Sequence, residues 1–239
     1  MAQGKTLSIC ILLIGCIFLS SCSGTSRVEL ERSILDTVLS GYNKDLRPPG
    51  ENATDVSVNT YVREILSVCE KSHQWKVQLT FRQEWNDARL VYSTEGNPDY
   101  HFLTLSSRKD IWTPDLFFSG EIEANLHQVP QSNVFVRIYP NGHVLYSIRI
   151  TLTLTCPGTG SAAGELVCPL SIASYAYTTE EVALSWKETD PVQVPATRIV
   201  LNEFTLGQVT TAATESQTVA GKFSKLLASF HLSRNRCTA

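Results

Sequence analysis

The chain has 239 residues, enough for one domain with a sizeable hydrophobic core. Its net charge is -3 at pH 7, and residues of both signs are spread along the sequence. Because there is no basic stripe, the composition argues against a nucleic acid partner.

The N-terminus has the pattern of a secretory signal peptide. A lysine precedes an apolar run from about Leu7 to Leu19, and small residues follow it. This run is shorter than the roughly 20 residues of a bilayer-spanning helix, and no later run approaches that length, so no transmembrane segment is expected. We expect residues 1–24 to be the signal and residues 25–239 to be secreted. A buried N-terminal helix and a bacterial lipidation box ending at Cys22 are the alternatives.

Four cysteines remain in the expected mature domain, and an even number in a secreted chain suggests two disulfides. Asn52-Ala53-Thr54 is an N-glycosylation sequon in a polar, proline-rich neighbourhood. We therefore expect Asn52 to be glycosylated on an exposed loop.

One helix is expected near the start of this domain. Ser26 and Glu29 fit a capping box, apolar residues then recur at helical spacing, and Gly41 stands where a helix would end. The pattern predicts an amphipathic helix over about 26–40.

From Val56 onward the hydrophobic period is that of strands. Several runs rich in β-branched and aromatic residues are separated by turn formers such as Pro140-Asn141-Gly142. An Asn-Gly pair between two alternating runs is a strong signal for a β-hairpin. The sequence therefore predicts a mostly β fold, an antiparallel β-sandwich with one N-terminal α-helix.

A series of segments carries a family resemblance. The strand around Trp85 reads FRQEWNDARL, the segment from Trp112 reads WTPDLFF, and the run from Val144 to Pro157 leads into a pair of cysteines. SYAYTT at 174–179 and a final GKF and FHL pair complete the series. Together they resemble the extracellular ligand-binding domain of pentameric Cys-loop ligand-gated ion channels, in the branch of the glycine, GABA and glutamate receptors. The resemblance covers nearly the whole mature domain and implies an Ig-like receptor β-sandwich.

The resemblance also bears on the cysteines. It implies that Cys156 and Cys168 close the short loop that gives the family its name. Cys69 and Cys237 have no obvious counterpart there, but both would lie at the end of the domain that meets the membrane in a channel. We expect a second disulfide between them, with free or intermolecular thiols as the alternative.

The loop between Cys156 and Cys168 departs from the family. It reads PGTGSAAGELV and is polar and small, whereas the channels carry a longer apolar loop that contacts their membrane domain. A loop that touches only water needs no apolar surface. With no membrane span before Ala239, the sequence resembles the soluble acetylcholine-binding proteins. A truncated extracellular domain of a ligand-gated anion channel is the alternative.

The resemblance implies a homopentamer with a small-molecule ligand at each subunit interface, in a box of aromatic side chains. Arg82 stands in the place of the arginine that grips the ligand carboxylate in glycine receptors, which suits a planar guanidinium. Alternate residues of a strand share a face, and this supports the grouping of the residues implied for the neighbouring subunit. The residues implied for one subunit are Phe117, Tyr175 and Phe223, and those for its neighbour are Thr80, Arg82, Leu145, Ser147 and Arg149.

Plainer readings of the same residues stay open. Phe117 and Tyr175 could fill the core, and Arg82 could be a solvated or interface charge. The position that would hold a carboxylate for a ligand amine is Ala173, and the capping-loop tyrosine is replaced by Thr218. A carboxylate-bearing or largely apolar ligand therefore fits better than acetylcholine.

Other function classes find little support. The five histidines show no metal-ligand spacing, and no nucleophile elbow or phosphate-binding loop occurs. Asp115, Glu121 and Glu123 could suggest paired catalytic acids, but they fall in and just after the WTPD segment, which favours a structural role. We expect no enzyme activity, no cofactor and no metal. A pentameric scaffold without a small-molecule ligand remains the other alternative.

Overall fold

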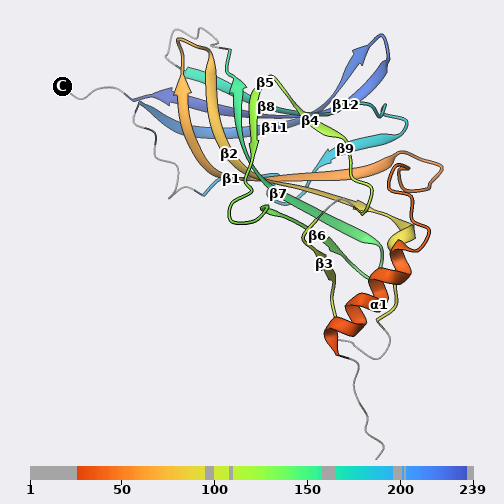
Figure 1. Cartoon of the computed structure of the whole chain (residues 1–239). Coiled ribbons are helices and arrows are strands. Elements are labelled where there is room, and N and C mark those ends of the chain that lie inside the picture. The colour runs from red at the N-terminus through yellow and green to blue at the C-terminus, as the bar shows by residue number, and fades with distance from the viewer. Residues whose placement is uncertain are drawn as a thin grey trace, which may run out of the picture.

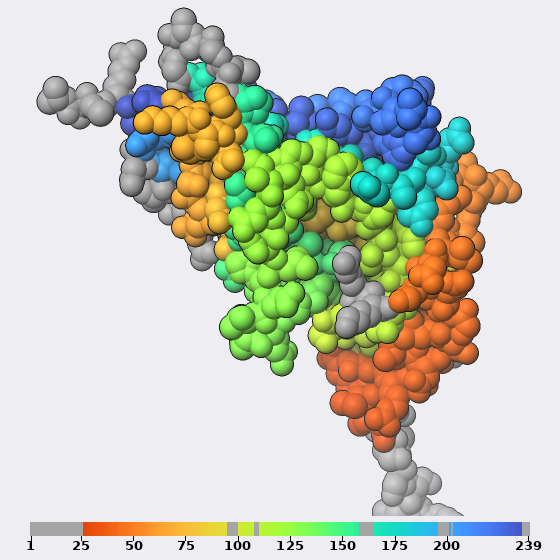
Figure 2. All heavy atoms as spheres, turned by 45° about the horizontal axis from the view of Figure 1, so that its top comes forward, coloured from red at the N-terminus to blue at the C-terminus, as the bar shows by residue number. Residues whose placement is uncertain are grey.

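The computed structural model describes residues 26–94, 100–107, 110–157, 165–195, 201 and 203–235. It confirms the predicted fold class, a mostly β sandwich with one N-terminal helix (Figure 1). The helix and the long C-terminal strands lie at opposite ends of the molecule, as Figure 2 also shows. The expected signal, residues 1–24, lies outside the described residues.

Helix α1 spans Arg27–Leu39, close to the predicted range. Its N-terminus is the predicted capping box, in which the Glu29 backbone N–H donates to Ser26 Oγ at 3.3 Å and the Ser26 backbone N–H donates to Glu29 Oε2 at 3.0 Å. These bonds satisfy amide groups that would otherwise lack partners in the first turn. Ile34 and Val38 are buried and attach the helix to the sandwich. Among the described residues, no helix is both long and apolar enough to cross a bilayer.

Two sheets form the sandwich. One has eight strands in the order β10-β1-β2-β7-β6-β3, with β5 also paired to β7 and β9 to β1. The other has four strands in the order β11-β12-β8-β4. The first sheet consists of β1 (Thr54–Cys69), β2 (Gln74–Asn86), β3 (Leu103–Leu105), β5 (Glu121–Leu126), β6 (Val134–Ile138), β7 (His143–Thr155), β9 (Val182–Trp186) and β10 (Val192–Gln193). The second consists of β4 (Leu116–Ser119), β8 (Glu165–Ser174), β11 (Phe204–Thr218) and β12 (Gly221–Arg234), and a 3-10 turn η1 (Ala88–Leu90) follows β2.

The pairing is antiparallel with two exceptions. Strands β9 and β10 run parallel to β1, at the edge of the eight-stranded sheet. After β8 the chain leaves the four-stranded sheet and crosses to this edge, and such a crossover allows parallel pairing. The predicted antiparallel sandwich is therefore confirmed, except that one edge of the larger sheet contains parallel pairs.

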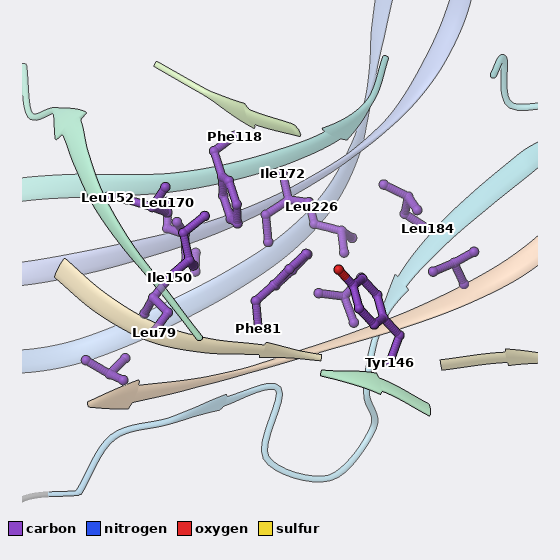
Figure 3. Packing of buried hydrophobic residues seen from close by; sticks show 14 of the residues in the cluster. Leu79, Phe81, Phe118, Tyr146, Ile150, Leu152, Leu170, Ile172, Leu184 and Leu226 are labelled. Atoms are coloured by element: carbon purple, nitrogen blue, oxygen red, sulfur yellow. The ribbon is translucent and has the colours of Figure 1, made fainter. Parts of the chain in front are cut away.

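The core fills the space between the two sheets (Figure 3). Phe81 of β2 and Phe118 of β4 meet edge to face, with ring centroids 5.1 Å apart. Trp75 and Phe230 form a second contact between the sheets, at 4.9 Å. Each such aromatic pair stabilises the fold by about 0.5–1.5 kcal/mol beyond the area that it buries. Residues that alternate with these core positions face outward from each sheet.

The WNDARL motif supports the fold. The Asp87 side chain is fully buried and accepts hydrogen bonds from Arg89 Nε and Nη2 at 2.9 and 2.7 Å and from the Tyr42 hydroxyl at 2.7 Å. The backbone N–H of Trp112 in turn donates to the Tyr42 oxygen at 3.2 Å. Burial and the Asp87 carboxylate raise the pKa of Tyr42. The buried Asp87 carboxylate needs such partners to offset the cost of its burial. Through them, the network ties the segment after α1 to the WTPD segment.

The predicted disulfide between Cys156 and Cys168 is confirmed, and both residues are buried. Asn52 is exposed in the loop before β1, where a glycan has room. Its glycosylation stays a prediction.

The β1–β2 turn and the end of β12 lie together. Arg234 Nη2 donates to Glu70 Oε2 at 2.6 Å, next to the exposed Cys69. A hydrogen bond from the Ser72 hydroxyl lowers the pKa of the Cys69 thiol, which favours the reactive thiolate. Cys237 lies outside the described residues, but it follows Arg234 by three residues, and three residues span at most about 11 Å. The expected second disulfide stays a prediction.

We predict that Cys69 and Cys237 pair. A proteolytic digest of the secreted, unreduced protein should contain a peptide pair that holds these two residues and separates on reduction. The Cys156–Cys168 peptide in the same digest is the control for preserved disulfides. Alkylation of Cys69 before reduction would contradict the pairing.

Glu84 joins three strands through its carboxylate. His143 at the start of β7 lies 3.3 Å from one oxygen, and Lys187 after β9 donates to the other. The hydrogen bond from His143, followed by that from Lys187, lowers the pKa of Glu84 from 4.5 to about 2. The ionised form is thus favoured in the folded state.

This shift predicts acid sensitivity. A carboxylate with a depressed pKa stabilises the fold fully above its unfolded pKa and loses that contribution as the pH falls through its folded pKa. The test compares the unfolding free energy of the wild-type chain with that of the Glu84→Gln variant. As the pH is lowered from about 5 to about 2, the difference between them should shrink by about 1–3 kcal/mol. Chemical denaturation across this range measures it. Parallel pH profiles for the two proteins would contradict it.

Candidate functional site

The five residues predicted for one side of the pocket share the outer face of the eight-stranded sheet. β2 pairs with β7 so that Thr80 lies opposite Arg149, Arg82 opposite Ser147, and Glu84 opposite Leu145. Thr80 and Ser147 are buried, whereas Leu145 and the two arginines are half-buried. The structure therefore brings this group together as strand parity predicted.

Arg63 of β1 joins this group, and sequence reasoning missed it. Its Nε donates to Thr80 Oγ1 at 2.7 Å. β1 has a register shift between Val62 and Glu64, so Arg63 has no direct partner in β2. Such irregularities defeat parity counting. We call these six residues the arginine face; they are Arg63, Thr80, Arg82, Leu145, Ser147 and Arg149.

Neutral amides hold Arg82 in place. Its Nη1 donates to Asn59 Oδ1 at 2.7 Å and to Gln193 Oε1 at 3.3 Å, from β1 and β10. Asn59 is itself fixed, since its Nδ2 donates to the Asp190 carbonyl at 2.5 Å. The guanidinium is thus oriented without being neutralised.

Arg149 is held in the same manner. Its Nε and Nη2 donate to Gln78 Oε1 at 3.1 and 2.7 Å, and Nη1 donates to Asn133 Oδ1 at 3.4 Å. In the part of the chain that the structure describes, neither Arg149 nor Arg82 makes an ion pair. Half-buried cations usually have an anionic partner, so this face suits a ligand that brings one.

A histidine network extends the arginine face. His127 Nε2 lies 2.8 Å from Thr151 Oγ1 and 3.4 Å from Gln78 Nε2. Burial, and then the charges of Arg149 and Arg63, lower the pKa of His127. A cavity of about 320 Å³ opens beside these residues, with Arg149 and Asn133 in its wall. The local field is therefore positive beside an accessible space.

The aromatic side of the predicted pocket lies on the four-stranded sheet. The Phe117 and Tyr175 rings meet edge to face with centroids 5.6 Å apart, and 38% and 74% of these residues are exposed. This exposure argues against a core role for either ring. Phe223 of β12 is half-buried, and among the described residues it makes no ring contact with the other two. The predicted aromatic box is thus a pair of rings with a third ring apart from them.

Asp115 presents Tyr175. Its carboxylate accepts from the Ser174 hydroxyl at 2.8 Å and from the Ala176 backbone N–H at 2.5 Å. Its own carbonyl accepts from the Tyr175 backbone N–H at 3.3 Å. The turn after β8 is therefore fixed to the WTPD segment. The oxygens of Asp115 accept hydrogen bonds from this turn, which is the structural role expected for it.

The two sides of the pocket do not meet within one chain. Phe118 points into the core, so its neighbour Phe117 points outward from the four-stranded sheet (Figure 3). Phe81 likewise points into the core, so Arg82 points outward from the other sheet. Outer faces of packed sheets point away from each other. One copy therefore holds two half-sites.

Comparison with known proteins identifies the family. Residues 31–236 match the family model described as the neurotransmitter-gated ion-channel ligand binding domain. The chain is 42% identical over 207 residues to a glutamate-gated chloride channel of Drosophila melanogaster. This alignment covers 83% of the chain and 45% of the relative, so the chain spans less than half of that protein's length. The chain belongs to the family of neurotransmitter-gated ion-channel ligand-binding domains, the extracellular domains of Cys-loop receptors.

Proposed function

We propose that this domain binds an acidic amino acid between two copies of itself, with glutamate as the first candidate. The observation that carries the proposal is the arginine face, where Arg82 and Arg149 are oriented by neutral amides and lack ion pairs among the described residues. The similarity to a glutamate-gated chloride channel supports the same ligand class.

The chemistry of the two half-sites fits such a ligand. A guanidinium offers paired donors in a plane, and a carboxylate accepts them in the same geometry. Phe117 and Tyr175 would cover the ligand from the neighbouring copy, and their ring faces attract an ammonium group. Ala173 offers that ammonium no carboxylate, so the anionic end of the ligand carries most of the recognition. The same argument disfavours acetylcholine, which has no anionic group.

We further propose a secreted homopentamer, as the family resemblance implies. Outward-facing half-sites on opposite sheets are completed only by a second copy, and closed rings satisfy every such contact. The polar loop PGTGSAAGELV supports contact with water rather than with a membrane domain. An extracellular domain of a longer anion channel, or an assembly without a small-molecule ligand, are the competing proposals.

The ligand proposal predicts that Arg82→Ala lowers the affinity for L-glutamate. Loss of a charge-assisted hydrogen bond costs about 1.5–3 kcal/mol, which corresponds to roughly 10- to 150-fold in affinity. Titration calorimetry on the full domain measures it, and Arg32→Ala, an exposed arginine on α1, is the matched control. A wild-type protein that binds no glutamate, or an Arg82→Ala variant that binds it equally well, would reject the proposal.

The assembly proposal predicts the mass of the purified domain. Light scattering after gel filtration should give about five times the mass of the mature chain. The Arg82→Ala variant should have the same mass, because loss of the guanidinium group affects ligand binding and not the assembly of the five chains. A monomer at the concentrations used for calorimetry would remove the two-copy pocket.

A further inference from the structure

Lys225 lies on the same face as the aromatic pair. In the four-stranded sheet, Ala173 of β8 is opposite Phe117 of β4 on one side and Lys225 of β12 on the other. Ser224 and Leu226 are buried in the core, so Lys225 points outward between them, as Phe117 does. The three residues form one row across the outer face of the sheet.

The row brings the lysine side chain close to the aromatic pair. Neighbouring strands lie about 4.8 Å apart, so the Cα atoms of Lys225 and Phe117 are roughly 10 Å apart. Ala173, between them, contributes only a methyl group and is itself buried, so neighbouring side chains cover it. The flexible four-carbon stem of a lysine can carry its ammonium over that methyl group, in front of the Phe117 ring. The Lys225 ammonium therefore lies beside Ala173, the position that has no carboxylate.

This ammonium is not neutralised by its own chain as far as the structure describes it. Among the described residues, no hydrogen bond or ion pair of the Lys225 side chain occurs. Two acids of this region are engaged elsewhere: Glu215 of β11 lies 3.9 Å from Lys222, and Asp115, just before β4, accepts from the Ser174 hydroxyl and the Ala176 N–H. The charge is available to a ligand.

We propose that Lys225 determines specificity by binding the second carboxylate of a dicarboxylate ligand. With arginines on one half-site and a lysine on the other, a ligand with two anionic groups is paired on both sides. A ligand whose only charge toward β12 is an ammonium is repelled, because like charges in a desolvated pocket are costly. The inference rests on the proposed function and adds to it the preference for dicarboxylates over monocarboxylates.

Glutamate and glutamine test this preference, because they have nearly the same shape but only glutamate carries a second carboxylate. Titration calorimetry should give the wild-type domain at least about tenfold higher affinity for L-glutamate than for L-glutamine. Lys225→Met should lower the glutamate affinity by about tenfold and change the glutamine affinity by less than about twofold. Lys225→Arg should keep most of the preference, because it keeps the charge.

Two variants separate the possible failures. Lys222→Met removes a lysine from the same strand, where the ammonium is exposed and near Glu215, and should leave both affinities unchanged. Arg82→Ala should weaken the binding of both ligands, because each carries the α-carboxylate.

If the wild-type domain binds neither ligand, the proposed function fails. If it binds glutamate and Lys225→Met keeps the wild-type preference, only the role of Lys225 is overturned. An unchanged mass by light scattering confirms that each variant assembles.

Discussion

The antiparallel pairing of β2 with β7 is the constraint on which the site depends. It places Leu79 and Phe81 in the core and, at the alternate positions, Thr80 and Arg82 on the outer face. A register slip of one residue would exchange the two sets, burying a guanidinium and exposing a phenylalanine. The large cost of that exchange holds the register, so the apolar core of the sandwich also fixes the position of the Arg82 charge on the outer face.

The chemistry of the arginine face follows from how its charges are held. Carboxylates opposite Arg82 and Arg149 would have stabilised the isolated domain and neutralised the face. Instead, the oxygens of Asn59, Gln193 and Gln78 orient the two guanidinium groups and leave their charge in place. An oriented cation loses little side-chain entropy on binding an anion, and this preorganisation favours affinity. In the proposed function, this arrangement would prepare the face for a carboxylate.

Sequence reasoning succeeded where local rules decide the fold. The capping box located α1, and the alternation of residues in β2 and β7 was sufficient to group Thr80 with Arg82. It missed Arg63, because the register shift in β1 breaks the alternation. The short strands between residues 103 and 126 gave no clear periodic signal, and the partners of Arg82 lie far from it in the chain, which local patterns cannot reveal.

The position of the two half-sites couples binding to assembly. The arginine face and the Phe117–Tyr175 pair point outward from opposite sheets, so a ligand that contacts both must lie between copies. Such a ligand binds the assembled state and not the separated chain, and its binding free energy therefore adds to that of assembly. A domain built in this way needs no ligand-induced change within its core to respond to a ligand. The interface itself is the element whose equilibrium the ligand shifts.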